Sequence, residues 1–212
     1  MSTSVPFDES EAKRAVVKVG EGRGFVVESA RSRLVITAAH CLPRLPVPHP
    51  HANEERTYWR LLGPLGREPV VTSECCFVDP VSDLAVLGPP NNQSLSSEAD
   101  AYDQLVESSA ALPIASVPAE FKVQFTGWLL SLPGAWCACI VSHYGGGLWI
   151  TDASEGIIGG MSGSPILNGD GAAIGVMSCT SGTDGEVHVE GGPNPRLLFH
   201  LPIWLVDEMP FE

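Results

Sequence analysis

The apolar stretches of this chain are short, and glycine or proline lies between most of them. The 212 residues include 22 Gly and 18 Pro, and 44% of the residues are hydrophobic. Runs long enough for an amphipathic helix are scarce, whereas short apolar runs bounded by Gly and Pro are typical of strands joined by turns. The length suits one domain or two fused halves with a full buried core. We therefore predict an all-β fold.

The runs that favour strands fall into two groups along the chain. They lie at residues 15–19, 24–28, 33–37, 58–62, 69–78 and 84–87, and then at 121–130, 136–142, 148–151, 165–167, 172–179 and 197–201. We expect one short helix near 101–110, in the polar stretch between the groups. A terminal helix is expected over 202–209, because Pro202 suits a first helical turn. Residues 1–13 are polar and are expected to fray.

Three short motifs contain the side chains for one kind of chemistry. The segment 37–41 contains His40, the segment 81–87 contains Asp83, and the segment 160–165 contains Ser162. A serine hydroxyl needs a neighbouring base to become a nucleophile, and histidine is a base near neutral pH. A carboxylate bonded to that histidine fixes its tautomer and orientation. We therefore predict that His40, Asp83 and Ser162 form a catalytic triad.

The turn around Ser162 is rich in small residues. Gly159, Gly160 and Gly163 allow the backbone to fold tightly around a substrate carbonyl. Such a reaction also needs N–H donors placed where the oxyanion develops. We predict that the backbone N–H groups of Gly160 and Ser162 form this oxyanion hole.

The composition argues against several kinds of partner. The net charge is −13 and the Lys and Arg residues are scattered, so no nucleic-acid partner is expected. No apolar run is long enough to span a bilayer, and the first ten residues lack the basic and apolar regions of a signal peptide, so no membrane partner is expected. No metal or organic cofactor is expected. His49 and His51 are interpreted as loop residues, because no cysteine or carboxylate cluster accompanies them.

The six cysteines do not have the pattern of a disulfide framework. Cys75 and Cys76 are adjacent, and Cys137 and Cys139 would point the same way from one strand. We interpret the cysteines as small buried hydrophobic residues rather than metal ligands. A reducing compartment, the cytoplasm, is the expected location.

The three motifs resemble those of the chymotrypsin-like (trypsin-like) serine protease family. Residues 37–41 match its histidine motif and 160–165 match its Gly-x-Ser-Gly-x-Pro motif, while 79–87 are most similar to the bacterial and high-temperature-requirement branch. The order His, Asp, Ser along the chain is also that of the family. The resemblance covers roughly residues 14–205. It implies two packed six-stranded antiparallel β-barrels with the active site between them, and we add the short C-terminal helix.

On this resemblance the chain is one protease domain with four parts. We assign residues 1–13 to an N-terminal tail, 14–100 to the first barrel with His40 and Asp83, 101–120 to a linker, and 121–212 to the second barrel with Ser162 and the C-terminal helix.

The resemblance also suggests residues that contact the substrate. Ser178, Cys179 and Thr180 correspond to the strand that runs beside the substrate backbone and lines the side-chain pocket. Thr180 stands where relatives with an open pocket have glycine, which favours a small aliphatic residue before the cut. An alternative places Arg196 in the pocket wall, which would favour an acidic residue there.

The chain departs from secreted members of the family beside the nucleophile. Met161 stands where the secreted digestive-type proteases have an aspartate that pairs with a newly cut N-terminus. Activation by a liberated N-terminal amine is therefore not expected. Cys41 also lacks its usual disulfide partner, because residues 1–40 contain no cysteine.

These observations lead to two main functional hypotheses. The first is a serine endopeptidase that hydrolyses protein or peptide substrates through an acyl-enzyme. The second is a catalytically silent module that retains the fold and uses its cleft to bind peptides or proteins. A narrower hypothesis joins them, in which the enzyme is a latent effector that a partner protein or signal activates.

Overall fold

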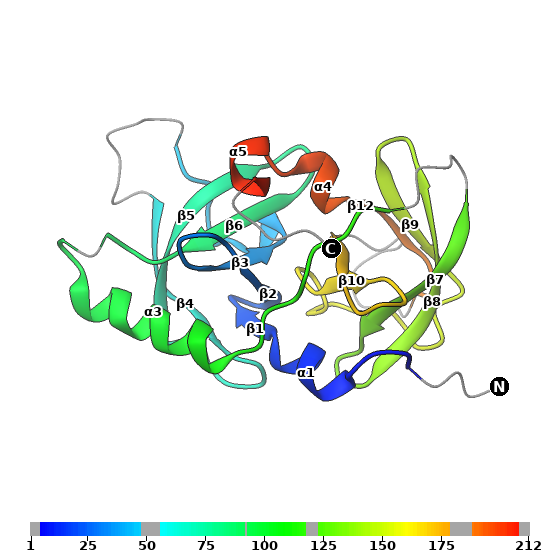
Figure 1. Cartoon of the computed structure of the whole chain (residues 1–212), viewed down its shortest axis with the longest axis horizontal. Coiled ribbons are helices and arrows are strands. Elements are labelled where there is room, and N and C mark those ends of the chain that lie inside the picture. The colour runs from blue at the N-terminus through cyan, green and yellow to red at the C-terminus, as the bar shows by residue number, and fades with distance from the viewer. Residues whose placement is uncertain (1–4, 48–55, 92, 118–122, 179–187, 208–212) are drawn as a thin grey trace.

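The strands form two bodies that lie side by side (Figure 1). The computed structural model describes residues 5–47, 56–91, 93–117, 123–178 and 188–207. The strands β1–β6 stand at the left of Figure 1 and the strands β7, β8, β9 and β12 at the right, and the segment after α3 runs between the two groups. The predicted pair of six-stranded antiparallel barrels is confirmed, with one barrel closed and the other nearly closed.

The first body is a closed barrel of antiparallel strands in the order β1-β2-β3-β6-β5-β4. Most of its inward positions hold Val, Leu and Ile, whose branched side chains pack well on a pleated surface. Its strands are β1 (Val16–Val19), β2 (Gly22–Glu28), β3 (Arg33–Thr37), β4 (Thr57–Pro64), β5 (Val71–Asp79) and β6 (Leu84–Gly88).

The second body is a six-stranded sheet in the order β11-β10-β7-β8-β9-β12. All its neighbouring pairs are antiparallel. Its strands are β7 (Gln124–Leu130), β8 (Trp136–Tyr144), β9 (Gly147–Thr151), β10 (Pro165–Leu167), β11 (Ala173–Val176) and β12 (Gly191–Pro195).

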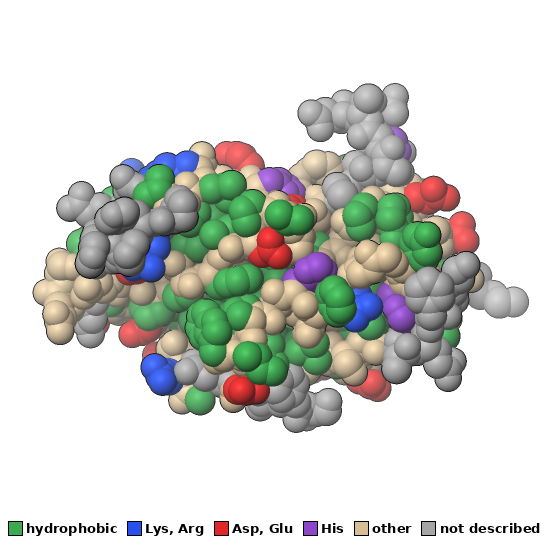
Figure 2. All heavy atoms as spheres, turned by 90° about the horizontal axis from the view of Figure 1, so that it is seen from above, with side chains coloured by type: hydrophobic (Ala, Val, Ile, Leu, Met, Phe, Trp, Pro, Cys, Tyr) green, Lys and Arg blue, Asp and Glu red, His purple; other side chains and the backbone are tan. Residues whose placement is uncertain are grey.

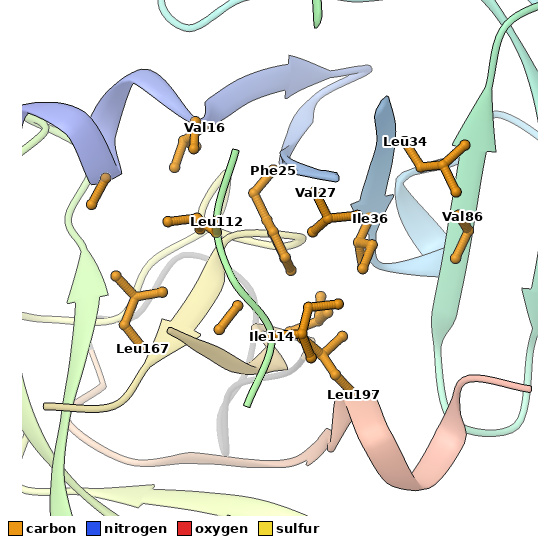
Figure 3. Close-up of a cluster of buried hydrophobic side chains, with 14 of the residues drawn as sticks. Val16, Phe25, Val27, Leu34, Ile36, Val86, Leu112, Ile114, Leu167 and Leu197 are labelled. Atoms are coloured by element: carbon orange, nitrogen blue, oxygen red, sulfur yellow. The ribbon is translucent and has the colours of Figure 1, made fainter. Parts of the chain in front are cut away.

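The connection between the bodies helps to fill the space between them. Leu112 and Ile114 of this segment lie among buried side chains from both sides (Figure 3). Phe25 and Ile36 come from the first barrel, and Leu167 comes from β10 of the second. Backbone bonds fix the segment as well, because Leu112 N donates to Val26 O at 2.9 Å and Ala173 N donates to Pro113 O at 2.8 Å. A single shared core therefore joins the two halves.

Four α-helices flank the strands in the described part of the chain. They are α1 (Glu9–Arg14), α3 (Ser96–Ser108), α4 (Leu197–His200) and α5 (Ile203–Val206). The short helix expected near 101–110 is present as α3, which starts earlier, and the expected terminal helix is present as the single turn α5 with Pro202 as its N-cap. None of these helices is long and apolar enough to cross a membrane.

Two local predictions are wrong. The stretch 197–201 is not a strand, because Leu197–His200 form α4 with Leu201 as its C-cap, and Leu197 and Leu201 are both buried in the core. A short apolar run fits a buried helical turn as well as a strand, and the last strand, β12, precedes it. The frayed tail over 1–13 contains α1, because the Asp8 carboxylate accepts from Ser10 N and Glu11 N at 3.0 Å and caps the helix.

The face that carries α4 and α5 has several exposed apolar side chains. Phe199, Ile203 and Trp204 are all exposed there. Figure 2 shows hydrophobic side chains in separate groups on this face, with acidic and histidine side chains between them.

Candidate functional site

His40 lies on a single helical turn that follows β3 directly. The turn covers Ala39–Cys41, and its start is fixed by a bond from Ala39 N to Asp83 O at 3.2 Å. The His40 backbone N–H also donates to Asp83 Oδ1, at 2.8 Å. The position of His40 therefore depends on the segment that contains Asp83.

Asp83 ends a tight turn between β5 and β6. The Asp79 carboxylate accepts from Val81 N at 3.0 Å and from the Ser82 hydroxyl at 2.6 Å, which folds the turn locally. Asp83 itself has φ of 59°, in the left-handed region that Asp tolerates better than most residues. This conformation leads into the buried strand β6 while the Asp83 side chain reaches His40.

The His40 ring and the Asp83 carboxylate form a close pair. His40 Nδ1 lies 2.7 Å from Asp83 Oδ2. The hydrogen bond to Asp83 raises the pKa of His40, although burial works against it and the charge of Asp83 adds to the rise. Burial would raise the pKa of Asp83, but hydrogen bonds from His40 and Ser178 outweigh it and lower the pKa. The pair thus favours a charged carboxylate next to a basic imidazole.

Ser162 lies in a turn that is bonded to both barrels. Its carbonyl accepts from Arg23 N of β2 at 2.7 Å, and the next N–H, of Gly163, donates to Met177 O at 2.7 Å. Gly163 has φ of 80°, and a Cβ there would lie 1.8 Å from Arg23 O. Only glycine allows this close approach, so the sequence motif has a direct structural cause.

The two predicted oxyanion donors are available. In the part of the chain that the structure describes, no acceptor pairs with the backbone N–H of Gly160 or of Ser162. Gly160 has φ of 89° and packs beside Leu132, whose Cδ2 would lie 3.4 Å from a Cβ at residue 160. Their role as the oxyanion hole, which needs two donors that are not bonded within the protein, stays a prediction.

Several of the predicted site residues line one pocket. His40, Gly160 and Ser162 line the same cavity of about 430 Å³, and Asp83 lies behind His40. Among the described residues no hydrogen bond joins Ser162 Oγ to the His40 ring. Such bonds are often long without substrate and shorten in the complex.

Comparison with protein families assigns most of the chain to one domain type. Residues 22–176 match the trypsin-like peptidase domain. The chain belongs to this family. No curated protein sequence is similar enough to count as a relative.

Two solved protease structures have a similar fold. A serine protease of a human pathogenic astrovirus superposes with a TM-score of 0.55 at 16% identity, over 90% of this chain and 94% of that chain. The HtrA-type protease AlgW, solved with a decapeptide, has a TM-score of 0.50 at 16% identity, over 84% of this chain and 49% of that chain.

The residues predicted to contact substrate are only partly covered. Cys179 and Thr180 lie outside the described residues, as do His49 and His51. Ser178 is described, and its hydroxyl donates to Asp83 Oδ2. Ser178 therefore contacts the outer side of the His40–Asp83 pair. Arg196 precedes α4, where its guanidinium lies 4.5 Å from the centre of the Phe199 ring.

Two polar residues that support the site of this peptidase domain were missed by sequence reasoning. Asn194 is buried, accepts from Ser178 N at 2.8 Å and donates to Leu148 O at 3.2 Å. The signal that could have found it is a polar residue within the segment 191–195, where its neighbours are Gly and Pro.

Arg23 was also missed, and it links the barrels next to Ser162. Its side chain is buried and donates to the carbonyls of Leu130 at 2.7 Å and of Ser131 and Leu132 at 3.1 Å. Burial lowers its pKa, and no carboxylate pairs with it among the described residues. Leu132 in turn lies next to Gly160, so Arg23 holds a segment that contacts the turn around Ser162, which we call the oxyanion turn for its predicted role.

Cys41 occupies the space opposite Gly22. A Cβ at residue 22 would lie 2.5 Å from Cys41 Sγ. The Cys41 thiol therefore fills the space that a side chain at residue 22 would need. Burial raises the pKa of this thiol to about 11. Cys41, Cys75, Cys76, Cys137 and Cys139 are free thiols, and Cys179 lies outside the described residues.

Proposed function

We propose that this trypsin-like peptidase domain is a serine endopeptidase that hydrolyses protein or peptide substrates through an acyl-enzyme. The observation that carries the proposal is the 2.7 Å contact between His40 Nδ1 and Asp83 Oδ2 beside the pocket that holds Ser162. This arrangement has a nucleophile, a base and an orienting carboxylate in the order that the reaction needs.

The reaction divides into two steps. Ser162 Oγ attacks the substrate carbonyl while His40 Nε2 takes its proton, and the N–H groups of Gly160 and Ser162 receive the oxyanion. His40 then gives the proton to the leaving amine, and the C–N bond breaks to leave an ester on Ser162. Water, activated by His40, hydrolyses that ester. Asp83 keeps the Nδ1 proton in place and stabilises the imidazolium throughout.

Covalent labelling tests this proposal directly. A fluorophosphonate probe should label the wild-type protein and should not label Ser162→Ala or His40→Ala. Wild-type protein that has not met the probe should also cut a peptide library, with the products identified by mass spectrometry, and prior treatment with the probe should abolish the cutting. Well-folded wild type that neither reacts with the probe nor cuts peptides would indicate a latent or inactive site, and continued failure to react in a cell extract that contains candidate activating partners would favour the binding module.

We also propose that the enzyme works in the cytoplasm and is held latent until a partner or signal acts. The free thiols support a reducing compartment, and Met161 at the position beside the nucleophile supports control without a new N-terminus. Cell fractionation with an antibody tests the location. Fast cleavage of unrelated unfolded proteins by the pure chain would contradict latency.

A further inference from the structure

The pocket beside His40 is lined by further residues besides His40, Gly160 and Ser162, the three that have predicted roles in catalysis. Gly160 and Ser162 are the lining residues that come from the second body, and the rest come from the first. The lining also includes Glu21, Leu42, Trp59 and Arg60 of the first body. Trp59 is 61% exposed although it is a large aromatic residue. An exposed aromatic residue therefore belongs to the pocket that contains His40 and Ser162.

An irregularity in β4 places Trp59 and Arg60 at this pocket. Tyr58 pairs with Ser73 and Leu62 pairs with Val71, so three residues of β4 stand opposite one residue of β5. Arg60 has φ of 53°, which is strained for a residue with a side chain. Such bulges redirect side chains and are common beside active sites.

The residues on both sides of the bulge are anchored. The Tyr58 hydroxyl donates to Arg44 O at 2.9 Å, and Leu61 O accepts from Gly20 N at 2.8 Å. Tyr58 and Leu61 are both buried. Trp59 and Arg60, between these anchors, are left exposed on the pocket side. The fold thus holds an exposed indole in a fixed place rather than on a loose loop.

Two features favour the leaving-group side of the reaction for this pocket. Ser178, which the resemblance assigns to the part of the substrate before the cut, does not line the pocket, whereas Gly22 and Cys41 of the first barrel do. In the proposed reaction His40 hands its proton to the leaving amine, so the chain after the cut begins beside His40, which lines this pocket.

We propose that this pocket binds the substrate residues that follow the cut, and that Trp59 selects a large apolar or aromatic side chain among them. The proposal rests on the proposed peptidase activity and names a substrate class for it. Aromatic and large aliphatic side chains gain from contact with an exposed indole face, while glycine offers no side chain to bury. The leaving-group side would therefore carry much of the specificity.

Acyl transfer to added amines measures this preference directly. A peptide p-nitrophenyl ester acylates Ser162 and releases p-nitrophenol. Water and an added amino-acid amide then compete for the acyl group, which gives the free acid or the longer peptide amide. In the transfer the amine nitrogen bonds to the acyl carbon and the ester bond to Ser162 breaks. His40 takes one proton from the amine and returns it to Ser162 Oγ. The amide occupies the same pocket as a leaving group, and the two products are separated by chromatography.

We expect the amides of Phe and Leu to compete with water about tenfold better than the amide of Gly in the wild type. In Trp59→Ala this advantage should fall to about twofold or less, and Trp59→Phe should keep most of it because the aromatic face remains. Trp204→Ala is the matched control, since Trp204 is also exposed but lies on α5 outside the pocket, and it should behave as wild type.

The outcomes separate the two proposals. If p-nitrophenol is released in a Ser162-dependent burst but all amides compete equally, the pocket assignment is wrong while the peptidase activity stands. If Trp59→Ala and Trp59→Phe both keep the full wild-type preference, the role of Trp59 is wrong. If no Ser162-dependent burst occurs with folded protein, the peptidase proposal fails and this inference fails with it.

Discussion

Asp83 controls the protonation of His40, so its replacement should change the pH dependence of activity. The base must be neutral to act, and the bond to Asp83 raises its pKa above the ordinary 6.5, so activity should grow as the pH rises through that raised value. In Asp83→Asn the effect of burial remains and lowers the pKa, so the acid limb should move to lower pH. The plateau of kcat/KM should fall by about 10⁴-fold. An acid limb that stays in place would contradict this role for Asp83.

Gly163 should tolerate no side chain. In Gly163→Ala the new Cβ would meet Arg23 O at 1.8 Å, at a φ of 80°. The free energy of unfolding should fall by about 2 kcal/mol or more, and probe labelling should be lost as the Ser162 turn moves. Gly169→Ala is the matched control, because nothing lies within 4 Å of a Cβ there. Urea unfolding and labelling of both variants would check the difference, and equal stability would contradict it.

At the scale of single residues, the motifs predicted which side chains would lie together. The structure pairs His40 with Asp83 and places Ser162 at the same pocket as His40, while their catalytic roles stay predictions. Asn194 and Arg23 could not be predicted, since their roles depend on carbonyls far away in the sequence. Trp59 could be recognised as an aromatic residue, but only the register of β4 shows that it is exposed at the pocket.

Among the elements, β2 and the end of β7 are linked by the side chain of Arg23. Arg23→Met would remove the donors of three carbonyls near the site and should destabilise the protein by about 2–4 kcal/mol. Arg23→Lys should restore part of this loss, because an ammonium keeps the charge but cannot match the fork of a guanidinium. Urea unfolding gives the stability, and a variant Arg23→Met as stable as wild type would contradict the link. The rate of probe labelling reports the effect on the oxyanion turn.

Most strands could be predicted because short apolar runs bounded by Gly and Pro usually form strands joined by turns. The mistakes occurred where local pattern and tertiary contact disagree. Leu197–His200 form the helical turn α4 because Leu197 and Leu201 reach the shared core in that conformation. The strand β12, with Gly, Pro and Asn, has no apolar signal and is fixed by its pairing with β9.

The whole molecule should unfold as one unit, because the connecting segment is part of the core between the barrels. Ile114→Ala should cost about 2–5 kcal/mol, since Ile114 is almost fully buried among side chains from both halves. The fluorescence of Trp128 and Trp136, both in the second body, should change together with far-UV circular dichroism from the whole chain. Two separate transitions in the wild type would show that the halves fold independently.

The polar link at Arg23 contains no group that titrates near neutral pH. A guanidinium keeps its proton and backbone carbonyls do not ionise, so this link between the barrels should not respond to mild acid. His40 does respond, because its imidazole gains a proton as the pH falls. Acidification would therefore silence the proposed enzyme while leaving its substrate cleft in working shape. Neutralisation would restore activity at the speed of a proton transfer, with no refolding step in between.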